Sequence, residues 1–224
     1  MKRVGFVFIL LAIALIATGA AVAQCGGGGD SQVAGGCGDF SYYFVTYFSN
    51  GNTSGAPDAV LRLINDGDYS TYQSEGQPNG NLWASIYVFD DSQELQECCN
   101  CFISADGLLS ESLNKELMAN TLTGRDETSR GVIKVISTYN PDPTNNYPVA
   151  GIRGWMTHIQ AASNTLAKGG AWSQKGPFYV TETELADANL VTAEEAALET
   201  SCSYAITLGS GYGVCSCTPE DYDF

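Results

Sequence analysis

Eight cysteines are the residues of this chain with the clearest chemistry. An even number of cysteines is typical of a disulfide framework when a protein is exported. Two of them flank a glycine-rich segment, three form the sequence CCNC, and three lie close to the C-terminus: Cys25, Cys37, Cys98, Cys99, Cys101, Cys202, Cys215 and Cys217.

The spacing inside the two clusters suggests how some of these cysteines are arranged. In extended chain, Cys99 and Cys101 share one face, and Cys215 and Cys217 share another. Cys98 then faces the opposite way, which would suit Cys202. Bridges between the clusters would close loops of about half the chain, and each would stabilise the fold by roughly 4–5 kcal/mol. The sequence leaves the full pairing open, since eight cysteines allow many connectivities.

A metal centre or a redox site built from the same thiols is the alternative. Tetrahedral zinc sites favour pairs spaced as C-x2-C, and neither CCNC nor CSC has this spacing. The chain also contains no C-x-x-C thioredoxin motif. We therefore predict disulfides and no bound metal at these positions.

His158 is the single histidine, so any Ser-His-Asp mechanism would have to use it. No G-x-S-x-G nucleophile elbow accompanies it, and we expect a structural histidine within a strand. Glu182 and Glu184 stand two apart on a predicted strand and share a face, as a glycosidase pair would require. The interpretation that we favour is the solvated face of an edge strand. We predict no catalytic residue and no enzymatic activity.

Two acidic segments are candidates for ion sites or turns. Residues 65–68 read Asn-Asp-Gly-Asp, a fragment of a calcium loop that lacks the twelve-residue pattern and its closing Glu. Structural calcium is thus the one cofactor that we keep as an alternative to none. Asp90 and Asp91, at the end of a predicted strand, indicate a turn.

The first 23 residues have the pattern of a secretory signal peptide. Lys2 and Arg3 precede an apolar run over residues 4–16, and Ala21-Val22-Ala23 supplies small residues for cleavage. An uncleaved membrane anchor is the alternative, but the run is short for a span, and no second one follows. Lipid attachment at Cys25 is a further alternative, disfavoured by Gln24. We expect an extracellular or cell-surface protein with no membrane span after cleavage.

The chain is strongly acidic, with 25 Asp and Glu against 10 Lys and Arg and a formal net charge of -15. Such a surface repels phosphate backbones, which argues against nucleic acid as a partner. The basic clusters that dock on anionic lipid are also missing. Partners are therefore expected to be proteins, either a second copy of this chain or another surface protein.

Pattern and turn signals predict a glycine-rich tether over residues 24–39 and one β-rich domain over residues 40–224. Residues 108–122 fit either a helix or a strand followed by a helical turn. A helix is expected near 193–208, with Thr192 and Glu195 as a capping box and Gly209 as the C-cap. The fold class is mainly β, an antiparallel β-sandwich with one C-terminal α-helix packed on it. Strands are predicted at 40–48, 59–64, 82–89, 102–104, 132–138, 152–159, 178–185 and 212–217.

The strand predicted at 40–48 is unusually aromatic and directly follows the tether. Its ordinary interpretation is a buried strand. The alternative is a segment that adds to the sheet edge of a neighbouring molecule, which would build filaments when repeated. The residues of this self-assembly hypothesis are Phe40, Tyr42, Tyr43, Phe44, Val45, Tyr47 and Phe48.

From residue 59 onward the chain resembles a family of small exported bacterial proteins with no known activity. The likeness rests on residues 86–101 (IYVFDDSQELQECCNC) and on shorter blocks at 106–109, 131–134, 155–159, 181–184 and 208–211. Cysteines, glycines and apolar strands dominate these blocks. The resemblance implies no activity of its own.

Together these observations predict a secreted, disulfide-stabilised structural or binding protein of the cell surface or extracellular matrix, one that self-assembles into filaments through residues 40–48. One alternative is a carbohydrate-binding module or glycoside hydrolase that uses Trp83, Trp155 and Trp172 as stacking platforms. The second alternative is a metal or redox protein built on the cysteine clusters.

Overall fold

A computed structural model describes residues 42–67, 80–123, 128–166 and 172–217, without the side chains of residues 162–176. All of these residues belong to one compact unit, which spans residues 39–224. The predicted tether, with Cys25 and Cys37, the signal peptide and Phe40 lie outside the described residues.

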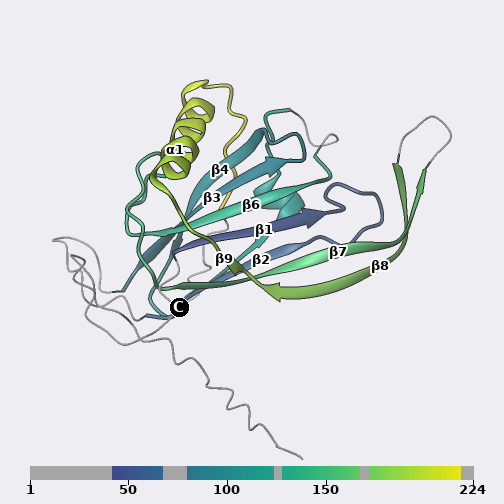
Figure 1. The fold of residues 1–224 in the computed structure, drawn as a ribbon, viewed down its shortest axis with the longest axis horizontal. Helices are drawn as coiled ribbons and strands as arrows, with labels where there is room; N and C mark the ends of the chain where they lie inside the picture. Colours follow the sequence, from purple (N-terminus) through teal and green to yellow (C-terminus); the bar gives the residue numbers. More distant parts are fainter. Residues whose placement is uncertain (1–41, 68–79, 124–127, 167–171, 218–224) are drawn as a thin grey trace, which may run out of the picture. The chain divides into compact units, whose positions relative to one another are not determined.

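The described chain forms two antiparallel sheets and one α-helix, as predicted from the sequence (Figure 1). Sheet A has the strand order β4-β3-β6-β1-β9, and sheet B has the order β5-β2-β7-β8. The elements in chain order are β1 (Tyr43–Ser49), β2 (Val60–Asn65), β3 (Leu82–Asp90), β4 (Leu95–Ile103), β5 (Leu108–Ser112), the π-helical turn η1 (Leu113–Leu117), β6 (Arg130–Thr138), β7 (Ile152–Leu166), β8 (Trp172–Glu184), β9 (Ala186–Asp187) and α1 (Thr192–Thr207).

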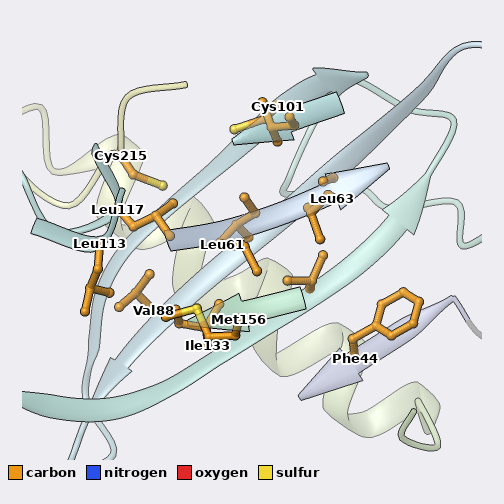
Figure 2. Close-up of a cluster of buried hydrophobic side chains, with 14 of the residues drawn as sticks. Phe44, Leu61, Leu63, Val88, Cys101, Leu113, Leu117, Ile133, Met156 and Cys215 are labelled. Carbon is orange, nitrogen blue, oxygen red and sulfur yellow. The ribbon is translucent and has the colours of Figure 1, made fainter. Parts of the chain in front are cut away.

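The main core lies between the inner faces of the two sheets. Alternate residues of each strand point inward, so β3 contributes Ile86 and Val88 while β2 contributes Leu61 and Leu63, all of them fully buried. Figure 2 shows Leu61, Leu63 and Val88 together with Met156 of β7 and with Leu113 and Leu117 of η1. Strand register is therefore set by burial, because a slip of one residue would expose the whole inner set.

A second core fixes α1 on the outer face of sheet A. Leu198, Cys202 and Ala205, the helical face predicted from their spacing, pack against Tyr87 and Ile136. The segment between β6 and β7 also folds over this face. Its Asn146 amide donates to the Tyr87 hydroxyl (2.8 Å), which itself donates to the Pro143 carbonyl (2.7 Å).

The helix begins differently from the prediction, and the Thr192–Glu195 capping box is wrong. Val191 is the N-cap, and its carbonyl accepts the N–H of Glu195 (3.1 Å), while no side chain caps the helix. Tertiary contacts fix this end instead, since Glu194 pairs with Lys134 of β6. The other end follows the prediction: Gly209 has a φ of 61°, the left-handed conformation that terminates helices.

Two strand predictions need correction and one ambiguity is resolved. The strand predicted at 102–104 is the end of β4, which starts at Leu95 and therefore contains the whole CCNC sequence. The first half of β4 was not predicted because its polar side chains are typical of surface loops. Gln96 is nevertheless buried, and its amide donates to the Asp90 carboxylate across the β3–β4 hairpin (2.7 Å). Residues 212–217 form only an isolated bridge at Val214. Residues 108–117 are a strand followed by a helical turn, the second of the two alternatives.

Candidate functional site

The six described cysteines form three disulfides between β4 and the C-terminal region. Cα–Cα distances are 5.8 Å for Cys98–Cys202, 5.2 Å for Cys99–Cys215 and 5.4 Å for Cys101–Cys217. Alternation along β4 sends Cys99 and Cys101 into the core between the sheets and Cys98 toward α1. The face argument favoured Cys98–Cys202 and two bridges between the clusters. The structure adds that Cys99 joins Cys215 and that Cys101 joins Cys217.

Backbone hydrogen bonds accompany the bridges and cover the outer edge of β4. The N–H of Cys98 donates to the Gly213 carbonyl (3.0 Å), and the N–H of Cys215 donates back to the Cys98 carbonyl (3.2 Å). Gly213 in turn donates to the Asn120 carbonyl (2.7 Å). The segment after α1 is therefore held on this edge by both covalent and hydrogen bonds.

Three sulfur atoms of these bridges lie close enough together to resemble a metal site. The Sγ atoms of Cys99 and Cys101 are 3.8 Å apart, and those of Cys99, Cys101 and Cys217 all lie within 4.8 Å. In this structure each belongs to a disulfide, and no cysteine in the described part of the chain is free. Disulfide sulfurs are poor metal ligands, because it is the thiolate that binds metal.

β1 lies inside sheet A, between β6 and β9 (Figure 1). It pairs with β6 along all seven of its residues, from Tyr43↔Ile136 to Ser49↔Arg130, but with β9 only at Phe44 and Val45. Tyr43, Phe44 and Phe48 are buried. Three of the five described aromatic residues of the self-assembly hypothesis thus fill a slot in their own domain, as the ordinary interpretation of this strand expects.

His158 is buried where β1 of sheet A approaches β7 of sheet B. Its ring stacks on Tyr47 at a centroid distance of 4.2 Å, and Nε2 lies 2.7 Å from the Thr183 hydroxyl. Burial lowers the pKa of His158, and the nearby backbone of Tyr47 opposes this shift in part. No carboxylate orients the ring among the contacts described, so the arrangement matches a packing role.

Glu182 and Glu184 lie on β8, the edge strand of sheet B, as predicted. Glu182 forms an ion pair with Arg62 on β2. Glu184 lines a polar cleft of about 190 Å³ together with Asp66, Arg153 and Asp187. The two carboxylates therefore have different neighbours, and Glu182 is neutralised by a partner that a hydrolytic pair would not need.

The segment considered for calcium is organised by an amide group. The buried Asn65 side chain donates to the carbonyls of Gly80 (2.6 Å) and Ile103 (3.2 Å) and accepts from the N–H of Gly67 (3.0 Å). Asp66 lies 3.9 Å from the Arg153 guanidinium. Asp68 lies outside the described residues, so calcium binding stays a prediction.

The other residues singled out in the sequence occupy separate places. Asp90 caps the β3–β4 hairpin, where its carboxylate accepts the N–H groups of Ser92 and Glu94 (both 2.9 Å). Trp83 is on β3 of sheet A, and Trp155 is on β7 of sheet B. Trp172 begins β8, and its side chain is not among those described. The two described tryptophans therefore do not share a sheet.

Sequence reasoning missed one feature that the structure makes prominent. β7 and β8 continue past the end predicted at Ile159 and form a long hairpin. Residues 160–177 are rich in Ala, Ser, Asn and Gly, which are poor strand formers, so propensity gave no signal there. A long run without acidic residues was the available clue.

Comparison with known proteins adds no name to these sites. No protein-family model, no curated protein and no solved structure matches this chain. Among the described residues, no helix has the length and apolar character that crossing a membrane requires. Any functional assignment must therefore come from the geometry above.

Proposed function

We propose that this protein is a secreted, disulfide-stabilised structural protein of the cell surface or extracellular matrix, and that its copies assemble by exchanging β1. The signal-peptide pattern and the three bridges support export, because disulfides persist mainly in oxidising compartments. The bridges also join α1 and the last described segment to β4, and no residue of β1 takes part in them, although Tyr43 of β1 packs against α1. Removal of β1 would leave this covalent framework intact.

The observation that carries the proposal is the way in which β1 is held. It is the first strand of the described chain, inserted between β6 and β9, and residues 50–59 connect it to β2. The same slot in a neighbouring molecule would offer identical hydrogen bonds and the same pockets for Tyr43, Phe44 and Phe48. Exchange therefore replaces the native contacts without loss, as in domain swapping.

The loop after β1 has the features of a hinge. Asn50, Asn52 and Gly55 have φ values of 60°, 51° and 80°, and two of the three are not glycine. Left-handed backbone is strained for such residues, although asparagine tolerates it best. Ser54, Gly55 and Pro57 are exposed, so they can change conformation without uncovering core. Strained connections of this kind favour strand exchange.

The test is a cross-link between β1 and β6 in the full chain. Tyr47 and Val132 are directly opposite in the register, so the Tyr47→Cys/Val132→Cys variant would form a disulfide across the pair. In assembled material, exchange predicts a ladder of covalently linked multimers on non-reducing gels. The single-cysteine variants serve as controls and should give no ladder. Linkage confined to single chains, or no assembly at all, would refute the exchange of β1.

A further inference from the structure

The hairpin formed by β7 and β8 extends beyond the sheet that carries it. β2 pairs with β7 only from Ile152 to Met156, whereas β7 continues to Leu166. From Gln160 onward, β8 is the only strand that pairs with β7 in the described chain. Figure 1 shows the two strands continuing as a ribbon past the neighbouring strands. We call residues 160–166 and 172–180 the arm.

A two-stranded ribbon is marginally stable in water, because it has no third strand and little apolar surface to bury. β8 is also the edge of sheet B, and none of the described strands pairs with its outer side. Such an edge presents unpaired N–H and C=O groups that can accept another strand. The arm is thus the part of the described fold that gains most from a partner.

The side chains near the base of the arm favour contact with protein. Tyr179 and Val180 are 60% and 55% exposed, although both are large and apolar. Residues 178–181 carry no charge and lie between Pro177 and Glu182, two residue types that block strand addition. The open stretch of edge is therefore short and well bounded.

Charge indicates the chemistry of the partner. The arm contains no Asp or Glu and one basic residue, Lys175, whereas the whole chain has 25 acidic residues and a net charge of -15. The arm thus carries one positive charge and no negative charge on a strongly acidic molecule. Complementary charge steers association and excludes like-charged partners. A second copy of this chain has such an acidic surface, and it is present wherever the first copy is, at the same concentration.

We infer that the arm docks on the acidic surface of a second copy, through the β8 edge at residues 178–181. Pairing of two arms would bring two positively charged segments together, so the contact joins different surfaces of the two copies. Such a head-to-tail contact need not close and can continue as a filament. This inference rests on the proposed self-assembly and adds a contact at β8 to the exchange of β1.

The test compares Val180→Glu with Val180→Lys in the full chain without its leader. Both variants remove the same apolar contact, but only glutamate places a negative charge against an acidic partner. Sedimentation velocity at low salt should show that Val180→Glu needs at least about tenfold more protein to assemble, with Val180→Lys closer to wild type. High salt should narrow the difference between them, because it screens charge.

Tyr204→Glu is the matched control, since Tyr204 is 69% exposed on α1 and lies outside the arm. It should assemble like wild type, and thermal unfolding should confirm that all three variants fold. Equal assembly of the two Val180 variants, or normal assembly of Val180→Glu, would overturn the docking of the arm and leave the structural role standing. A wild-type protein that stays monomeric at every salt concentration would overturn both proposals.

Discussion

In the part of the chain that the structure describes, the outer edge of β4 in sheet A is covered, whereas the outer edge of β8 in sheet B is open. Along β4, the segment after α1 bonds the strand at Cys98, and three disulfides hold that segment and the helix in place. Along β8, none of the described strands covers the edge, and Tyr179 and Val180 are exposed. Exposed edges invite association unless they are covered or charged. One side of the molecule is thus closed covalently, and the other is available for contact.

The same difference extends to how each region depends on solution conditions. The β4 edge is held in part by three disulfides, which only a reductant breaks, so salt and pH should affect it little. Contacts made by the arm would rest on backbone pairing and on charge, which salt weakens. Covalent closure at the β4 edge would keep the domain folded while the β8 edge makes the contact that we propose.

The largest expected effect follows from reducing all the bridges. The first closure, a separation of 104 residues at Cys98–Cys202, is worth roughly 4–5 kcal/mol, and the two further bridges add roughly 2–3 kcal/mol each. Their sum is comparable with a typical domain stability of about 5–15 kcal/mol. We expect a thiol reductant to unfold the protein, as measured by circular dichroism.

The control for this experiment is the Cys25→Ser/Cys37→Ser variant, which separates any contribution of the glycine-rich segment. It should keep the wild-type midpoint in urea before reduction and lose structure with wild type afterwards. A reduced protein with an unchanged urea midpoint would mean that packing alone closes the β4 edge.

A smaller loss is expected when Cys101–Cys217 alone is removed as the Cys101→Ser/Cys217→Ser variant. The neighbouring Cys99–Cys215 bridge still joins β4 to the C-terminal segment. The extra loop that Cys101–Cys217 closes therefore contains only a few residues. The chain-entropy model then gives a loss of about 2 kcal/mol, well below the value for an isolated bridge of the same separation. Urea unfolding of the variant measures this. A loss of 4–5 kcal/mol would show that the bridges act independently.

The Cys98→Ser/Cys202→Ser variant sharpens this comparison, because among the three described bridges that one joins α1 itself to sheet A. With the other two bridges intact, about a dozen residues separate Cys202 from the next tie at Cys215. The loss should therefore be greater, about 3 kcal/mol. The reverse order of the two variants would contradict the entropic account.

What could be read from the sequence depended on the strength of periodicity. Alternation along CCNC was enough to place Cys99 and Cys101 on one face, because residues in a strand have a period of two. Most strands were predictable from β-branched and aromatic residues in the same way. The length of β4 was not, since Gln96 and Glu97 look like surface residues and yet are buried.

The candidate sites were less predictable than the fold. The arm was missed because its composition is that of a loop, and only pairing with β7 makes it a strand. The start of α1 was misjudged because tertiary pairing of Glu194 with Lys134 outweighed a local capping signal. The position of β1 between β6 and β9 could not be predicted, because periodicity carries no information about the order of the strands in a sheet.

The smallest expected effect concerns His158, at the base of the arm. Burial lowers the pKa of His158 in the folded protein below its ordinary value of 6.5. At acidic pH the unfolded chain therefore binds a proton at His158 more readily than the folded protein does. The free energy of unfolding should fall as the pH drops below about 6.5. The loss should be less than that from removing Cys101–Cys217. Urea midpoints at several pH values between about 5.5 and 7.5 would measure it.

The matched variant is His158→Gln, which can still bond the Thr183 hydroxyl but does not titrate. Its stability should vary less with pH over this range than that of wild type. Because the ring of His158 stacks on Tyr47 of β1, proton uptake should also weaken the packing of β1. The Tyr47→Cys/Val132→Cys variant cannot test this, because it lacks the Tyr47 ring. If the urea midpoints of wild type and His158→Gln change with pH in parallel, protonation of this histidine does not affect the stability of the fold. The contact between β1 and the base of the arm would then be insensitive to acid.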